Sequence, residues 1–213
     1  METNELLARH ASAWHEATHH PFLHGIRTGS LAAGALDTWL VQDHAFVDAS
    51  LRFQARVLAR APRADQLLLA GGLTALAEEL IWFEGVATAR YLPLDAALQP
   101  ACRAYTEAFD RLVTRADPAP YAALITTVWA VERAYLDAWL GARPGAPAFR
   151  EFVERWTVEP FQVYVAALAA AADRALAEAA SAARRDAEAA FLAVARHERA
   201  FWQMAFTGRT ASG

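Results

Sequence analysis

The sequence predicts an all-α fold in one domain, and three features lead to this prediction. The chain is rich in alanine, leucine and arginine, which favour helices, and only 10 glycines and 9 prolines occur among its 213 residues. These prolines and glycines gather at a few breaks that leave segments of helical length between them. A chain of this length can bury one core, so residues 1–213 are expected to form a single domain.

The breaks separate seven or eight expected helices. Each break stops a helix because proline lacks a backbone N–H and glycine carries a high conformational entropy cost. The breaks lie near His20-Pro21, Gly25 to Gly34, Ala61-Pro62, Leu92-Pro93, Asp117 to Pro120 and Gly141 to Pro147. In chain order, the expected helices span residues 3–18, 33–60, 64–91, 97–115, 119–140, 148–158, 160–178 and 181–206.

Three stretches within this pattern need separate arguments. The segment from Gly141 to Pro147 resembles a linker, but it is too short to separate domains and is interpreted as a helix connection. The alanine-rich stretch 166–190 carries charges at helical spacing, so it is expected to form two helices around a turn. Gly71-Gly72 lies inside a predicted helix, where close packing against a neighbouring helix explains it.

Charge and cysteine content exclude several classes of protein. The 24 acidic and 20 basic residues give a net charge of −4 and are interspersed, so no basic face is expected for nucleic acid. The single cysteine, Cys102, cannot form an intrachain disulfide or a cysteine-based zinc site, which fits a reducing cytoplasm. Residues 1–18 lack the apolar region of a secretory signal. The apolar runs are shorter than the ~20 residues of a membrane span, so no membrane partner is expected.

The most informative residues are acids on helix faces that should be apolar. A carboxylate that leaves water costs several kcal/mol unless other groups compensate it. Glu132 has Val128, Trp129, Tyr135 and Trp139 at helical neighbour positions, which places it on an apolar stripe. Three more acids repeat the pattern: Glu198 beside Phe201 and Trp202, Asp43 beside Trp39 and Phe46, and Glu79 beside Trp82 and Phe83.

Four such acids on four helices favour a functional pocket over four separate structural roles. A single buried acid is most often satisfied by an arginine, tyrosine or tryptophan donor. Repeated burial is how enzyme sites raise carboxyl pKa values for acid and base catalysis. Tyr105 and Tyr164 also fall on apolar faces, where each phenol could bind a ligand or satisfy a neighbouring carbonyl.

Two other kinds of site find little support in the sequence. Six of the seven histidines lie within the first 44 residues, and no Glu-x-x-His pair occurs among the core helices, so no metal is expected. Cys102 has no histidine predicted beside it and is expected to be a small core residue. The chain also lacks a Gly-x-Ser-x-Gly elbow and a phosphate-binding glycine loop.

Four segments, in their order and spacing, resemble the TenA (thiaminase II) family, which has a haem-oxygenase-like helical fold. They are His20-Pro21-Phe22 before a glycine-containing loop, Trp39-Leu-Val-Gln-Asp-His44, Ala104-Tyr105-Thr106 and Glu198-x-x-Phe201-Trp202-x-Met204-Ala205. In the cysteine branch of that family a catalytic thiol lies on the fifth helix, and here Thr127 or its immediate neighbour is expected at that position. The thiol is absent, so the chain is similar to the glutamate branch, TenA_E.

Further segments carry the resemblance to that branch. They are Val128-Trp-Ala-Val-Glu132-x-x-Tyr135, Glu78-Glu-Leu-Ile-Trp-Phe83 and Arg155-Trp156-x-x-x-x-Phe161-x-x-Tyr164. The resemblance implies salvage of the thiamin pyrimidine, in which 4-amino-5-aminomethyl-2-methylpyrimidine is hydrolysed to the hydroxymethyl pyrimidine and ammonia. It implies no cofactor, and little cleavage of intact thiamin in the absence of the thiol.

The resemblance also implies roles for individual residues. Asp43 corresponds to the aspartate that holds the aminopyrimidine edge, and Glu198 to the glutamate that acts as acid or base. Phe46 would stack on the ring. From their positions, Glu132 and Glu198 are expected to divide the acid and base tasks. The catalytic candidates are therefore Asp43, Glu132 and Glu198, and the substrate-binding candidates are Phe46, Glu79, Tyr105, Trp129, Tyr135 and Tyr164.

Other functions remain open at this point. A deformylase or amidohydrolase acting on a formylated aminopyrimidine, or a cofactorless oxidase, could use the same fold. A small-molecule-binding protein without turnover would not need both buried glutamates, and a haem carrier would show a spectral change with haemin. The partners expected for the chain are a small aminopyrimidine and further copies of itself, as a dimer or tetramer.

Overall fold

A computed structural model describes residues 1–32, 34–114 and 119–208, and these residues confirm the all-α, single-domain prediction. They form ten α-helices and one 3-10 turn, η1, rather than seven or eight helices. The helices are α1 (Thr3–Arg9), α2 (Ala11–Thr18), α3 (Pro21–Thr28), α4 (Ala35–Leu58), α5 (Arg63–Arg90), α6 (Pro100–Thr114), α7 (Tyr121–Gly141), α8 (Arg150–Arg155), α9 (Glu159–Glu178) and α10 (Ser181–Thr207), with η1 at Pro147–Phe149. The helix ends predicted at residues 33 and 115 lie outside the described residues.

The two additional helices lie near the N-terminus. The predicted helix 3–18 is divided at His10, whose backbone leaves the helical region and whose ring bonds Glu188 of α10 at 2.8 Å. A further helix, α3, forms at Pro21–Thr28, where a loop was predicted. Proline is favoured in a first helical turn, and the His20 ring accepts a hydrogen bond from the backbone N–H of Phe22. Gly29, with φ of 80°, ends this helix.

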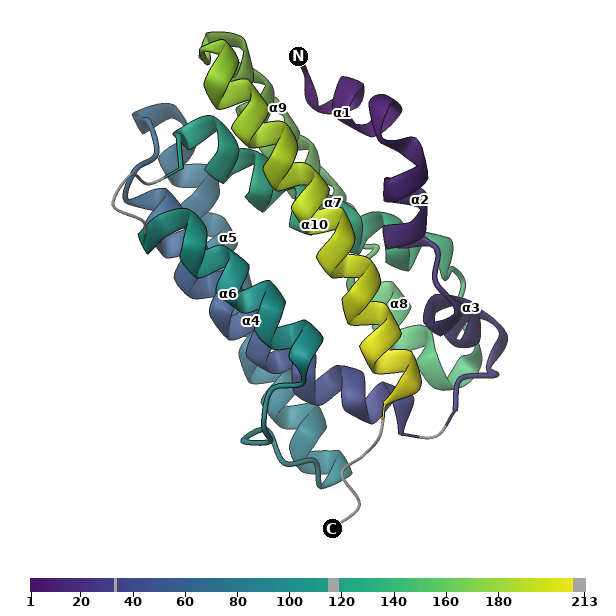
Figure 1. Cartoon of the computed structure of the whole chain (residues 1–213). Helices are drawn as coiled ribbons and strands as arrows, with labels where there is room; N and C mark the ends of the chain where they lie inside the picture. The colour runs from purple at the N-terminus through teal and green to yellow at the C-terminus, as the bar shows by residue number, and fades with distance from the viewer. Residues whose placement is uncertain (33, 115–118, 209–213) are drawn as a thin grey trace.

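The long helices form two groups that enclose the functional region. Helices α4, α5 and α6 pack together on one side, and α7, α9 and α10 on the other (Figure 1). Helix α10 contacts α4 and α6 as well as α7, and α9 contacts α5, so the two groups are joined along their length. The N-terminal helices α2 and α3 cover the outside of α7 and α10. Residues that point inward from both groups therefore face each other across the bundle.

A layer of buried tryptophans fixes the register between the groups. Trp39 of α4, Trp139 of α7 and Trp202 of α10 are fully buried. The ring centroids of Trp39 and Trp139 are 5.4 Å apart, and those of Trp139 and Trp202 are 6.1 Å apart. Each side chain of this size contributes a large share of the buried apolar area. One helical turn away from this layer lie Asp43, Tyr135 and Glu198 on the same three helices. The tryptophan layer therefore positions the polar residues of the site.

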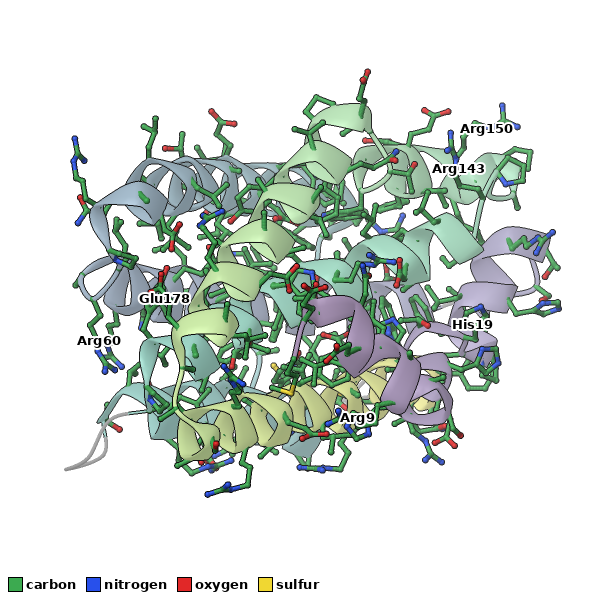
Figure 2. The ribbon with its side chains drawn as sticks, turned by 90° about the horizontal axis from the view of Figure 1, so that it is seen from above. Arg9, His19, Arg60, Arg143, Arg150 and Glu178 are labelled. Carbon is green, nitrogen blue, oxygen red and sulfur yellow. The ribbon has the colours of Figure 1, made fainter. Side chains whose placement is uncertain are left out.

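Helix α5 leaves large apolar side chains exposed. Among the described helices, α5 is the one that is long and apolar enough to cross a membrane by length and composition. Only 22% of its apolar 18-residue window is buried in the protein. Leu67 and Ile81 of this helix are 83% and 68% exposed. The labelled arginines Arg9, Arg60 and Arg150 lie well apart from one another in Figure 2, so these three cations do not form one cluster.

Candidate active site

A cavity of about 270 Å³ lies between the two helix groups. Its volume is near the lower end of the range for small-molecule pockets, which suits a ligand of single-ring size. Its wall is mostly apolar and aromatic, and carries three acids and one arginine. The residues that line it are Phe46, Val47, Ser50, Gly72, Ala75, Leu76, Glu78, Glu79, Val131, Glu132, Tyr135, Arg155, Trp156, Phe161 and Tyr164.

The four predicted acids converge on this region in two layers. Glu79 of α5 and Glu132 of α7 line the cavity directly. Asp43 of α4 and Glu198 of α10 lie behind its wall, 0% and 2% exposed. The acids are close enough to influence one another, because Glu79 and Glu198 raise the pKa of Asp43 and Glu132 raises that of Glu198. The structure therefore brings together all four carboxyls that the sequence singled out.

Burial is the main reason that these carboxyls hold their protons unusually strongly. It raises the pKa of Glu79 and Glu132 to about 7 and that of Glu198 to about 8, from ordinary values of 4.5. The pKa of Asp43 is also raised well above its ordinary value, first by burial and then by the neighbouring acids. At neutral pH the cluster therefore holds both protonated and ionised carboxyls, which acid and base catalysis requires.

Asp43 is satisfied on one oxygen only. The hydroxyl of Tyr135 donates a hydrogen bond to its Oδ2 atom. Its Oδ1 atom is buried and has no hydrogen-bond partner among the described residues. A buried polar atom without a partner is rare in folded proteins. This oxygen is therefore a candidate for contact with a ligand that carries a donor or, if the carboxyl is protonated, an acceptor.

Tyr105 connects Glu198 to aromatic residues of α4 and α10. Its hydroxyl donates to Glu198 Oε1 at 2.8 Å, so of the two roles considered for this phenol it binds the acid rather than a backbone carbonyl. The Tyr105 ring packs against Phe46 with a centroid distance of 4.7 Å and stacks on His197 at 4.9 Å. These contacts fix the Tyr105 ring, and its hydroxyl in turn fixes one oxygen of Glu198.

Glu132 accepts a hydrogen bond from a residue that was not among the predicted site residues. Gln54 of α4 donates from Nε2 to Glu132 Oε1 at 2.9 Å, and the hydroxyl of Tyr164 on α9 donates to Gln54 Oε1 at 3.4 Å. Gln54 lies three turns after Asp43 on the same face of α4 as Phe46 and is 2% exposed. The spacing of eleven residues from Asp43 was the signal that could have identified it.

Gly72 of α5 makes room for this arrangement. A Cβ atom on Gly72 would lie 2.1 Å from the Tyr164 hydroxyl oxygen and 3.1 Å from Gln54 Oε1. The predicted close packing at the glycine pair is thus confirmed for Gly72, whereas Gly71 has open space beside its Cβ position.

Replacing Gly72 with alanine is expected to displace the Tyr164 hydroxyl and weaken ligand binding about tenfold or more. The new methyl group would occupy the place of this hydroxyl, and a 1 Å displacement at a site is costly. The ligand-induced rise in melting temperature measures the effect. Gly71→Ala is the matched control and should bind normally. Normal binding by Gly72→Ala would show that the Tyr164 position is not needed.

The remaining acid of the cavity is flanked by aromatic and cationic groups. Trp156, which follows α8, donates from Nε1 to Glu79 Oε1 at 2.7 Å. The guanidinium of Arg155 lies 4.3 Å from the ring centroid of Trp82, in a cation–π arrangement, and lowers the pKa of Glu79 against the effect of burial. Neither Trp156 nor Arg155 was among the predicted site residues, although both lie in a segment that carried the resemblance.

The other predicted substrate-binding residues fall in two places. Phe46, Tyr135 and Tyr164 line the cavity with Glu79, whereas Tyr105 lies behind it. Trp129 does not line it. Its ring packs beside both Trp14 and Phe191, with centroid distances of 6.5 and 5.8 Å, because three residues along α7 turn it about 60° from Glu132. Trp129 is part of the packing between α2, α7 and α10.

Thr127, at the position expected for the thiol, does not line the cavity that holds Glu132. The hydroxyl of Thr127 donates to the backbone oxygen of Ala123 on its own helix, and Thr127 lines a separate cavity beside His197. One turn further along α7, Val131 lines the cavity that holds Glu132. The valine at position 131 offers no nucleophile to this cavity.

The carboxyl cluster is arranged for hydrogen bonding. Its recorded partners are the hydroxyls of Tyr105 and Tyr135, the amide of Gln54 and the indole of Trp156. Within the described residues, no group of three or more His, Cys, Asp or Glu side chains is placed to hold a metal ion. The site can bind a flat aromatic ring in its apolar part and exchange protons at its acidic part.

Comparison with known proteins agrees with this architecture. A family model described as TENA/THI-4/PQQC family matches residues 7–208. The chain is 32% identical over 213 residues to a probable bifunctional TENA-E protein of Glycine max, which covers 95% of this chain and 92% of that protein. It is similar in structure to a TenA homologue from Pyrococcus furiosus, with a TM-score of 0.90, 23% identity and coverage of 97% and 100% of the two chains.

A more distant structure extends this agreement to the fold of a protein described as a thiaminase. The putative TenA-like thiaminase of Sulfolobus solfataricus has a TM-score of 0.80 and 14% identity, and the match covers 97% of this chain and 96% of that one. At such identities the structures establish the TenA-like fold, whereas the family follows from the match over residues 7–208 and from the soybean relative. The chain belongs to the TENA/THI-4/PQQC family.

Proposed function

We propose that this protein is an aminopyrimidine hydrolase, which converts 4-amino-5-aminomethyl-2-methylpyrimidine and water to the hydroxymethyl pyrimidine and ammonia. The observation that carries the proposal is the convergence of four carboxyls with raised pKa values on one aromatic cavity. The relative named as a probable bifunctional TENA-E protein supports a function in the same branch.

The aromatic wall and Asp43 would hold the substrate. Phe46, Phe161 and Trp156 offer flat apolar surface to the pyrimidine ring. A protonated Asp43 can donate to a ring nitrogen and accept from the exocyclic amine, which places two hydrogen bonds along one edge. Because Asp43 lies behind the wall, binding in this way displaces the Tyr135 hydroxyl from its carboxyl group.

Two carboxyls in unlike surroundings would share the proton transfers. The reaction breaks the bond between the methylene carbon and the leaving nitrogen and forms a bond from that carbon to a water oxygen. One carboxyl keeps the leaving nitrogen protonated so that it departs as ammonia, and the other accepts a proton from the attacking water. Glu132 and Glu198 are the pair we assign, with no covalent intermediate.

The cation at the cavity supports a second candidate, hydrolysis of the N-formyl derivative of the same pyrimidine. Arg155 lines the cavity, and among the described residues its guanidinium makes no hydrogen bond or ion pair. Its free N–H groups could bind a carbonyl oxygen and stabilise the negative charge that develops there during amide hydrolysis. This reaction would release formate instead of ammonia.

Product analysis with the purified protein tests the proposal. The protein is given the aminomethyl pyrimidine and its formyl derivative separately, and ammonia, formate and hydrogen peroxide are measured. Ammonia from the first substrate is the expected result, and formate from the second would establish the amidohydrolase. If neither product forms and neither compound raises the melting temperature, the proposed function is wrong. Binding without any product would leave a binding protein, and peroxide would indicate an oxidase.

A further inference from the structure

We infer that Gln54 is a positioning residue that keeps Glu132 as the proton-accepting carboxylate of the site, so that Glu132 is the base and Glu198 the acid. The assignment of base and acid rests on the proposed function. The contact between Gln54 and Glu132 does not, and it can be tested without a substrate.

The geometry fixes which end of the Gln54 amide meets Glu132. The amide has one acceptor end and one donor end. Its acceptor, Oε1, receives the Tyr164 hydroxyl at 3.4 Å, and its donor, Nε2, is 2.9 Å from Glu132 Oε1. Turning the amide over would place its oxygen against Glu132 Oε1, which is repulsive when Glu132 is ionised, and would turn its donor end toward the Tyr164 hydroxyl. The absence of a side chain at Gly72 leaves room for the Tyr164 hydroxyl at this end of the amide.

A fixed donor favours the ionised form of its partner. A hydrogen bond from an amide N–H to a carboxylate is about twice as strong as one to a neutral acid. Gln54 therefore lowers the pKa of Glu132 against the effect of burial, which raises it. The amide cannot accept a proton from Glu132 in this orientation, so the contact does not serve the protonated form equally well.

Glu198 has a partner of a different kind. Its Oε1 atom is bonded to the hydroxyl of Tyr105, and a hydroxyl can donate to a carboxylate or accept from a protonated acid. Tyr105 thus satisfies Glu198 in both protonation states, as a group that gives and regains a proton requires. Glu132 also lines the cavity, where it can contact a water molecule, whereas Glu198 is 2% exposed.

The titratable and polar groups around Glu132 come from six other helices or their ends. One of them, Arg155, is a cation, and the others are acids or neutral polar groups. They are Gln54 of α4, Glu79 of α5, Tyr105 of α6, Arg155 at the end of α8, Tyr164 of α9 and Glu198 of α10. Arg155 acts on Glu79. Gln54 is the one hydrogen-bond donor to the Glu132 side chain recorded among the described residues.

Replacing Gln54 with methionine, which has a similar size and no N–H, tests the inference. Carboxyl protonation is followed in the ligand-free protein by infrared difference spectroscopy between pH 5 and 10, and Glu132→Gln identifies the signal of Glu132. The midpoint of that signal should rise by roughly one pH unit in Gln54→Met. The ascending limb of the pH profile of kcat/KM should move upward by the same amount.

Gln42→Met is the matched control. Gln42 is a buried glutamine on the same helix, 3% exposed, and bonds the backbone of Ala97 and Gln99 far from Glu132. Its replacement should lower stability without moving the Glu132 midpoint. Tyr164→Phe keeps Gln54 but frees its amide to turn, so a smaller upward shift is expected in that variant.

An unchanged Glu132 midpoint in folded Gln54→Met would overturn the inference, as would an equal shift in Gln42→Met. If Gln54→Met does not fold, Tyr164→Phe decides alone, with an upward shift in support and no shift against. Failure of the proposed function has a different signature. The wild type would then release no ammonia, while the midpoints of the variants would still differ as described.

Discussion

Replacing Glu198 with glutamine is expected to reduce ammonia release by about 10³-fold while ligand binding is retained. General acid or base catalysis contributes typically 10²- to 10⁴-fold, and glutamine keeps the shape of the side chain but cannot exchange the proton. The Tyr105 hydroxyl can still donate to the amide oxygen, so the surrounding packing should persist. Steady-state rates of ammonia release and the ligand-induced change in melting temperature measure the two effects.

Glu188→Gln is the matched control for this experiment, because it makes the same substitution on the same helix, α10, where the side chain pairs with Arg9 and His10 away from the cavity. It should leave turnover unchanged. Normal turnover in Glu198→Gln would remove Glu198 from the mechanism. A parallel loss of ligand binding would show that this carboxyl holds the substrate instead of acting on it.

The free energy of unfolding is expected to fall between pH 5.5 and 8.5, and the fall should be smaller in Glu198→Gln. In the unfolded chain a glutamate releases its proton near pH 4.5, whereas in the folded protein burial raises the pKa of Glu198 to about 8. Between these values the folded state binds more protons, so stability decreases as pH rises and the contribution is lost above the folded pKa. At about 1.4 kcal/mol per pKa unit, one such carboxyl changes stability on the order of 3 kcal/mol.

Urea unfolding at the two pH values measures this dependence. Glu198→Gln removes one of the titrating groups, so it should be more stable than the wild type at pH 8.5 and closer to it at pH 5.5. Glu188→Gln should keep the slope of the wild type. If wild-type stability rises between pH 5.5 and 8.5, the buried carboxyls are ionised in the folded protein and their raised pKa values are wrong.

Much of the fold could be predicted because local sequence and packing agree in the long helices. Helices α4 to α7 begin and end close to the proline and glycine breaks, and α9 and α10 meet at the turn predicted within the alanine-rich stretch 166–190. The region before residue 34 was less predictable. There His10 and His20 end or begin helices through contacts of their own rings, with Glu188 and with the Phe22 backbone, and such contacts leave no periodic signal.

The site was predictable to the extent that it depends on helix faces. An acid on an apolar stripe identified Asp43, Glu79, Glu132 and Glu198, and all four lie together. The sequence could not predict which residues line the cavity and which lie behind its wall, because this depends on how the helices cross. Trp129 shares the stripe of Glu132 by spacing, yet the crossing of α2 and α10 over α7 places it in the packing.

Long-range contacts of a polar residue, such as those of Gln54, also limited what could be predicted from the sequence. A glutamine on a helix face is ordinarily a surface residue, and its role here depends on three neighbours from α5, α7 and α9 that lie far away in the sequence. The same applies to Arg155 and Trp156, whose approach to Glu79 depends on the path of the chain after α8. The spacing of Gln54 from Asp43 indicates its helix face, but the partners of these three residues are set only when the two helix groups are in contact.

The pH dependence of ammonia release by the wild type tests the central claim most directly, namely that paired buried carboxyls catalyse hydrolysis of an aminopyrimidine. With Glu132 ionised as the base and Glu198 protonated as the acid, kcat/KM should rise toward pH 7, pass through a maximum and decline above pH 8. A rate that does not change between pH 5.5 and 9.5, or no ammonia at any pH from a protein that binds the substrate, would contradict the account.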